Sequence, residues 1–92
     1  MRYSPNDQKN YKAVILDNGL RVLLIENNES QKSAAAVAIN VGHFNDPKDR
    51  QGLAHFLEHM LFLGTQKYPN GSEFQKFISQ HGGSNNAWTA TE

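Results

Sequence analysis

The chain contains no cysteine, no excess of charge of either sign and no long hydrophobic run. Without thiols it can form no disulfide framework, no cysteine-based zinc finger and no thiol nucleophile, so a bound metal would need histidine and carboxylate ligands. Nine Lys and Arg balance nine Asp and Glu and are scattered along the chain. This pattern lacks the basic footprint of a protein that binds nucleic acid or an anionic membrane, so neither is expected as a partner.

The length of 92 residues suffices for one small domain at most, and such a chain is more often part of a larger domain. The longest apolar run, residues 34–39, is much too short to span a bilayer. The polar residues that follow Pro5 are unlike the apolar core of a signal peptide. The sequence therefore predicts a cytoplasmic protein.

The amino-terminal part of the chain predicts an arm followed by a β-hairpin. Residues 1–10 are polar and predict a flexible arm, which leaves residues 11–92 as the structured part. Two β-prone runs at 13–16 and 20–25 flank an Asn-Gly pair at 18–19, which is typical of a tight hairpin turn.

Two further strands and two helices are predicted after the hairpin. Val37, Ile39 and Val41 alternate at the period of a strand, which favours a buried strand over residues 33–41. The predicted elements that follow are a helical turn opening at Asp46-Pro47, a helix over 51–63 ended by Gly64, a helix over 73–81 with Ser72 and Gln75 as a capping box, and a strand over 84–91. The sequence thus predicts an α+β fold, with an antiparallel or mixed sheet and both helices packed on one of its faces.

His55, Glu58 and His59 form the sequence HFLEH in the first predicted helix. At about 100° per residue, their side chains share one arc of the helix surface. The other directions are apolar, which predicts a helix buried on nearly all sides, where unpartnered polar groups would cost roughly several kcal/mol. A zinc ion bound by both histidines, with Glu58 taking a proton from metal-bound water, would satisfy all three groups. The commoner metalloprotease order, His-Glu-x-x-His, is the reverse of this one.

Two other interpretations of the motif stay open. The two histidines and Glu58 could merely hydrogen-bond to one another or to the backbone. Alternatively, His43, His55, His59 and His81 could form a closed structural metal site, in which Glu58 would have no purpose.

The remaining candidate residues favour structural roles. His43 follows a glycine in a loop and is expected to be solvated, although it could approach the metal. His81 stands at the carboxyl end of the second predicted helix, where a cation is favoured, so it is expected to act as a cap. Phe44 and Trp88 are expected to pack against other side chains.

The stretch GLAHFLEHMLFLGTQKYP resembles the zinc-helix signature of the pitrilysin and insulin-degrading enzyme family of inverted-motif zinc metallopeptidases. The segments LDNGLRV, VGHFNDP and HGGSNNAWTATE resemble that family's amino-terminal domain in the same order, so the resemblance covers residues 11–92. It implies a zinc cofactor with His55 and His59 as ligands, Glu58 as the general base, and peptides or small unfolded proteins as substrates. Asn86 and Ala87 correspond to an edge strand along which the substrate lies as an added strand.

The resemblance also implies that parts of the active site lie outside this chain. Family members supply the third zinc ligand, a Glu, from a later helix, and a carboxy-terminal half closes a chamber around the substrate. Asp46 and Glu92 are conceivable third ligands from this chain, but neither stands at the family's position. The chain is therefore expected to be an amino-terminal fragment that is inactive by itself.

A non-catalytic function is the alternative. A truncated relative of the family could bind peptides, or associate with itself, through an exposed sheet edge and an uncovered apolar surface.

Overall fold

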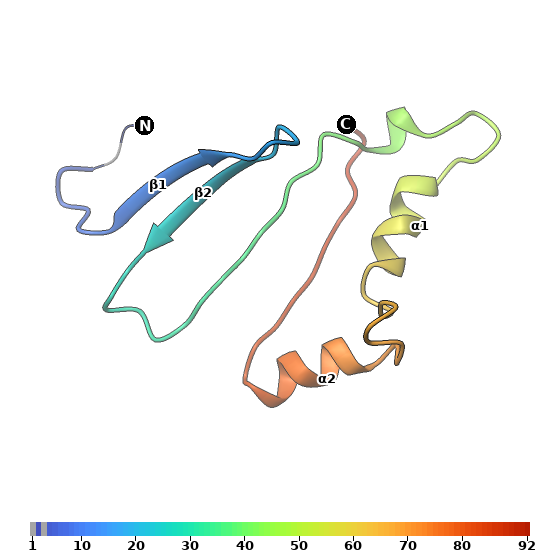
Figure 1. Ribbon diagram of the computed structural model, residues 1–92. Coiled ribbons are helices and arrows are strands. Elements are labelled where there is room, and N and C mark those ends of the chain that lie inside the picture. Colours follow the sequence, from blue (N-terminus) through green and yellow to red (C-terminus); the bar gives the residue numbers. More distant parts are fainter. Residues whose placement is uncertain (1, 3) are drawn as a thin grey trace. The chain divides into compact units, whose positions relative to one another are not determined.

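The computed structural model describes residue 2 and residues 4–92. The chain divides into two compact units, Met1–Ala36 and Val37–Glu92, each of which is described by itself. The first unit contains the strands β1 (Asn10–Ile15) and β2 (Arg21–Glu26), and the second contains the 3-10 helix η1 (His43–Asn45) and the helices α1 (Leu53–Met60) and α2 (Glu73–Gln80) (Figure 1). Strands and helices occupy separate stretches of the chain, which confirms the α+β class.

The first unit is an antiparallel β-hairpin, as predicted. Its turn is closed by two backbone hydrogen bonds, from the N–H of Leu16 to the carbonyl of Leu20 at 2.9 Å and from the N–H of Gly19 to the carbonyl of Leu16 at 2.8 Å. Gly19 has a φ of 85°, a conformation that glycine adopts without a steric penalty. Strand β1 begins at Asn10, three residues earlier than the predicted run. The flexibility predicted for residues 1–10 stays a prediction.

The two strands predicted after the hairpin are absent. Residues 33–41 and 84–91 form no strand, and Val37 and Ile39 are 79% and 72% exposed instead of buried. The physical reason is that a strand exists only where a neighbouring strand pairs with it. Within the described residues, only β1 and β2 form such a ladder.

Helix α1 lies inside the predicted range of 51–63 but is shorter. Its last turn tightens, with the N–H of Leu63 donating to the carbonyl of Met60 at 3.1 Å, and Gly64 follows with a φ of 115°, which confirms the predicted left-handed stop. The prediction that this helix is buried is wrong, because Phe56 is 64% exposed and Leu57 58%. No hydrophobic side chain in the described part of the chain is buried.

Helix α2 confirms the predicted second helix, but its amino-terminal end differs from the prediction. The predicted capping box is wrong, because the Ser72 hydroxyl donates to Asn70 Oδ1 at 3.0 Å and makes no hydrogen bond to the helix. At the other end, His81 Nδ1 donates to the carbonyl of Phe77 at 2.7 Å, which confirms the predicted cap. Among the described residues, no helix is both long and apolar enough to cross a membrane. The cytoplasmic location stays a prediction.

Candidate metal centre

His55 and His59 stand one helical turn apart on α1, so their rings lie on the same face. Their Nε2 atoms are 2.9 Å apart and their ring centroids 4.7 Å apart. At this separation one imidazole donates a hydrogen bond to the other. This contact agrees with the interpretation in which the two histidines hydrogen-bond to each other.

The same nitrogen pair fits a zinc ion. Zinc binds a histidine nitrogen at about 2.0–2.1 Å, which places two nitrogens of one tetrahedral ion about 3.3 Å apart. The two Nε2 atoms, at 2.9 Å, would need to separate only slightly, and both side chains are exposed. The donor set is therefore suited to zinc, although it supplies two ligands of the three that a catalytic site uses.

No third donor stands beside the pair among the residues that the structure describes. Within residue 2 and residues 4–92, no group of three or more His, Cys, Asp or Glu side chains could hold a metal ion. The interpretation of His43, His55, His59 and His81 as a closed structural metal site is therefore wrong. Neither Asp46 nor Glu92 joins such a group, and the origin of the third ligand outside this chain stays a prediction.

Glu58 lies on the same helix and is partly buried. Its Oε2 accepts a hydrogen bond from the Thr89 hydroxyl at 3.0 Å, a contact between residues 31 positions apart. The carboxylate thus bonds to neither histidine. The sequence pattern did not identify Thr89, because nothing local in the sequence indicates which residue faces Glu58 in the fold.

Both histidines and Glu58 line a shallow hollow of about 440 Å³. Residues 85–89 form another wall of this hollow, together with Phe62 and Gln75. The structure therefore brings Asn86 and Ala87 to the same hollow as the HFLEH motif. The predicted packing of Trp88 is wrong, because this side chain is 83% exposed; the same is true of Phe44, which is 77% exposed.

Asp46 fixes the start of the helix that carries the motif. Its carboxylate accepts hydrogen bonds from the N–H of Gly52 at 2.8 Å and of Ala54 at 2.9 Å, and its side chain is only 2% exposed. The bond from Ala54, followed by the bond from Gly52 and the charge of His43, lowers the pKa of Asp46 against the opposing effect of burial. A single turn opens at Pro47 as predicted, since the N–H of Arg50 donates to its carbonyl at 2.9 Å.

His43 lies closer to the motif than the loop position suggests. Its ring centroid is 6.2 Å from that of His55, in an edge-on arrangement, and its Nδ1 is 3.8 Å from Asp46 Oδ2. With 41% of its side chain exposed, His43 is not simply solvated. It stands next to the candidate metal centre without joining the pair of Nε2 atoms.

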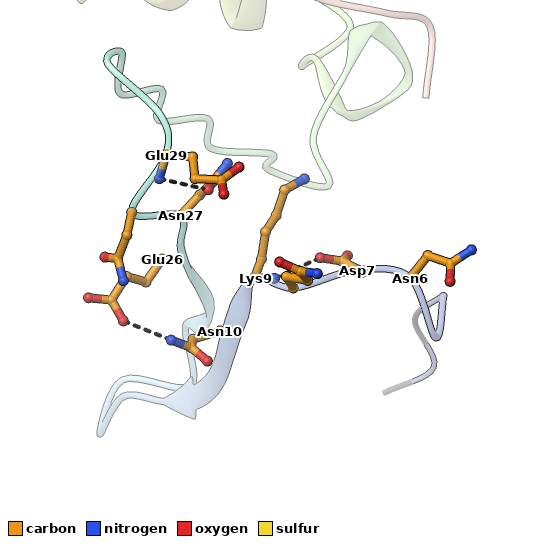
Figure 2. A pocket seen from close by; sticks show the side chains of 9 residues that line it. Asn6, Asp7, Lys9, Asn10, Glu26, Asn27 and Glu29 are labelled. Atoms are coloured by element: carbon orange, nitrogen blue, oxygen red, sulfur yellow. Dashed lines mark hydrogen bonds between the residues drawn. The ribbon is translucent and has the colours of Figure 1, made fainter.

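A second hollow lies at the open end of the hairpin (Figure 2). Hydrogen bonds join groups of its lining: Asn10 Nδ2 donates to Glu26 Oε2 at 3.2 Å, and the N–H of Lys9 donates to Asp7 Oδ1 at 2.9 Å. Asp7 Oδ2 also accepts a hydrogen bond from the hydroxyl of Tyr11, which lies outside the lining. The hydrogen bond from Tyr11 is the main cause of a lowered pKa at Asp7. This hollow contains no histidine and offers no comparable metal donors.

A third hollow, of about 500 Å³, lies beside α2 and is mainly apolar. Its lining includes Leu61, Phe74, Phe77 and Ile78. It also contains no histidine, so the hollow beside α1 is the candidate site.

Comparison with known proteins agrees with the family resemblance of the sequence. The family model described as "Insulinase (Peptidase family M16)" matches residues 21–92. The chain is 48% identical over 89 residues to insulin-degrading enzyme of Homo sapiens and 45% identical over 86 residues to the A-factor-processing enzyme of Saccharomyces cerevisiae. These alignments cover 97% and 94% of this chain but 9% and 8% of the relatives, so the chain spans about a tenth of their length.

Among solved structures, the crystal structure of pitrilysin is similar over 98% of this chain and 10% of the pitrilysin chain, with a TM-score of 0.81 and 41% sequence identity. The family match includes the HFLEH motif, the loop around Asp46 and the segment that carries Thr89. Sequence, fold and motif agree, and the chain belongs to the insulinase family of peptidases, family M16.

Proposed function

We propose that the protein is a zinc-dependent metalloendopeptidase that hydrolyses peptides or small unfolded proteins, with water as the nucleophile. The observation that carries the proposal is the pair of Nε2 atoms 2.9 Å apart, in one hollow with the Glu58 carboxylate. Zinc, when bound, lowers the pKa of water and polarises a carbonyl oxygen. In this chain His55 and His59 are the proposed ligands.

Glu58 is the proposed general base. Its carboxylate shares the hollow with both histidines, and only Oε2 is engaged, by Thr89. Oε1 has no hydrogen-bond partner among the described residues, so it is free to accept a proton from the attacking water.

Asn86 and Ala87 are proposed to hold the substrate backbone. They lie in an extended segment that lines the hollow, and within the described part of the chain no backbone hydrogen bond involves residues 84–89. Free N–H and carbonyl groups of an extended segment can pair with a peptide that lies beside it as an added strand. Recognition through the backbone would accept many sequences.

The rest of the active site is proposed to come from other parts of the protein. The chain spans about a tenth of the length of its relatives, and the described residues supply two zinc donors. We propose that the third ligand and the chamber wall follow in sequence, and that both helices pack on one face of a sheet in the complete domain. By itself, this chain is then expected to be inactive.

The test combines zinc affinity and peptide cleavage in the protein expressed from its complete gene. Replacing Glu58→Gln should lower kcat by about 10²- to 10⁴-fold and leave zinc affinity unchanged, because a general base contributes roughly that factor. Replacing His55→Ala should abolish both zinc binding and cleavage, whereas Gln80→Ala, on the exposed end of α2, should change neither. Zinc should bind the 92-residue chain only weakly. Full hydrolysis by the Glu58→Gln variant would disprove the proposal.

A non-catalytic, peptide-binding or self-associating module is the second candidate. It is favoured by the absence of a third metal donor and of buried hydrophobic side chains in the residues that the structure describes. A fluorescent peptide that binds without being cleaved, with equal affinity in the presence of a chelator, would support this function over the first.

A further inference from the structure

The segment of residues 84–91, here called the returning segment, runs from the end of α2 back toward η1 (Figure 1). It is attached near both ends. Asn85 Nδ2 donates to Gln75 Oε1 at 3.0 Å, and at the other end the N–H groups of His43 and Phe44 donate to the carbonyls of Ala90 and Thr91 at 3.1 and 3.0 Å. The position of Thr89 is therefore set by the backbone bond of the residue that follows it.

Thr89 is the one residue of this segment whose side chain reaches the HFLEH motif through a hydrogen bond. Its hydroxyl, partly buried, donates to Glu58 Oε2 at 3.0 Å. A hydroxyl that donates to a carboxylate makes a charge-assisted bond, which favours one orientation of the carboxylate. Within the described residues Glu58 makes no other side-chain hydrogen bond and no ion pair, so this bond alone restrains its carboxylate.

We propose that Thr89 is a positioning residue for Glu58. It holds Oε2 and so presents Oε1 to the hollow that His55 and His59 share, which is where the attacking water must lose its proton. The inference rests on the proposed function, because it assigns Glu58 the role of general base. It adds a residue whose effect on the reaction passes through Glu58.

A purely structural role would predict something different. If the bond merely ties the returning segment to α1, its loss would loosen the wall of the hollow and weaken peptide binding. If the bond orients the base, its loss would slow turnover and leave peptide binding and zinc affinity in place. The separation of kcat from KM therefore distinguishes the two roles.

The experiment measures kcat, KM and zinc affinity in the zinc-loaded protein expressed from its complete gene, with a quenched fluorescent peptide. Thr89→Val, which keeps the shape and removes the donor, should lower kcat about tenfold, a part of the full effect of general-base catalysis. KM and zinc affinity should stay within about twofold of the unchanged protein. Thr89→Ser, which restores the hydroxyl, should restore kcat.

Thr91→Val is the matched control, because Thr91 is exposed and its side chain makes no hydrogen bond among the described residues. The proposal is overturned if Thr89→Val leaves kcat unchanged, if Thr91→Val lowers it equally, or if Thr89→Ser does not restore it. These results test the role of Thr89 only if the Glu58→Gln variant is inactive, because Thr89 is proposed to act through Glu58. A Glu58→Gln variant that still hydrolyses the peptide instead overturns the proposed function.

A second measurement needs no activity. The side-chain carboxyl ¹³C signal of Glu58 in the metal-free protein expressed from its complete gene is identified by its loss in Glu58→Gln. This signal should move in Thr89→Val and keep its place in Thr89→Ser and Thr91→Val. A Glu58 signal that Thr89→Val does not move would show that the bond is absent in solution, and would overturn the proposal.

Discussion

Asp46 shows how one carboxylate can fix the helix on which the candidate metal centre stands. It accepts the N–H groups of Gly52 and Ala54, which are among the first donors of α1 and have no partner inside the helix. Local capping patterns place the capping residue directly before the helix, whereas Asp46 reaches it across a loop. From the sequence, Asp46 is predicted to start a turn or to be a conceivable metal ligand. Its capping role can be recognised only in the structure.

The hydrogen bonds to Asp46 make the start of α1 sensitive to acid. Because they lower the pKa of Asp46 below its ordinary value of 3.8, the bonds stabilise the fold fully above that value and are lost as the pH falls through the lowered pKa. Amide hydrogen exchange at Gly52 and Ala54, compared with global exchange, should therefore accelerate below about pH 4. In Asp46→Asn, which cannot ionise, this local pH dependence should vanish, while Asp49→Asn, at an exposed position, should keep it. Equal pH dependence in Asp46→Asn would contradict the assignment.

At the scale of the elements, Gly42 allows the returning segment to pass close to η1. A Cβ atom at this position would come within 2.5 Å of the carbonyl oxygens of Ala90 and Glu92. Real Cβ atoms do not approach oxygen so closely, and the Ala90 carbonyl cannot move aside without breaking the hydrogen bond that it accepts from the N–H of His43. Gly42 is accordingly buried, although it stands in a loop.

Replacing Gly42→Ala should therefore detach the end of the returning segment. The N–H groups of His43 and Phe44 should exchange with solvent faster, as measured by amide hydrogen exchange, because they lose the carbonyls of Ala90 and Thr91. Gly19→Ala is the control, since a Cβ there meets no atom within 4 Å and strains only the hairpin turn. Unchanged exchange at His43 and Phe44 in Gly42→Ala would show that the loop adjusts without releasing the segment.

The elements that the sequence predicted correctly are those specified by neighbouring residues. The Asn-Gly turn at 18–19 brings β1 and β2 together, and the apolar periodicity of 73–81 specifies α2. The strands expected over 33–41 and 84–91 failed because alternation predicts only that a segment can be extended. Whether it becomes a strand depends on a partner far away in sequence, which a local pattern does not contain.

The same distinction applies to the candidate site. His55, Glu58 and His59 were predictable because helical spacing places their side chains on one arc. Thr89 was not, because its contact with Glu58 spans 31 positions and depends on the path of the returning segment. The position of His43 beside His55 depends on the turn of η1, so it could not be predicted from the sequence either.

For the molecule as a whole, the main feature is the exposure of apolar side chains. Phe74 and Phe77, on α2, are 46% and 59% exposed and line an apolar hollow. Exposed apolar patches of this kind favour association. We expect the apparent mass of the isolated 92-residue chain, measured by light scattering, to rise with concentration.

Phe77→Glu should reduce this association, because it places a charge in the apolar hollow. Gln80→Glu is the matched control, since it adds the same charge to an exposed position of the same helix. A monomeric mass at every concentration, or an equal effect of both substitutions, would contradict the role assigned to this surface.

The attachment of the returning segment also bears on how the protein could be re-engineered. Asn85, Thr89 and the carbonyls of Ala90 and Thr91 hold it in place, whereas the exposed side chains of Asn86 and Trp88 hold no neighbour by a hydrogen bond in the described structure. Exposed positions on a segment that is held by other residues tolerate substitution, as the tips of antibody loops do. A combinatorial library restricted to Asn86 and Trp88 would therefore diversify the rim of the hollow while its supporting contacts stay unchanged.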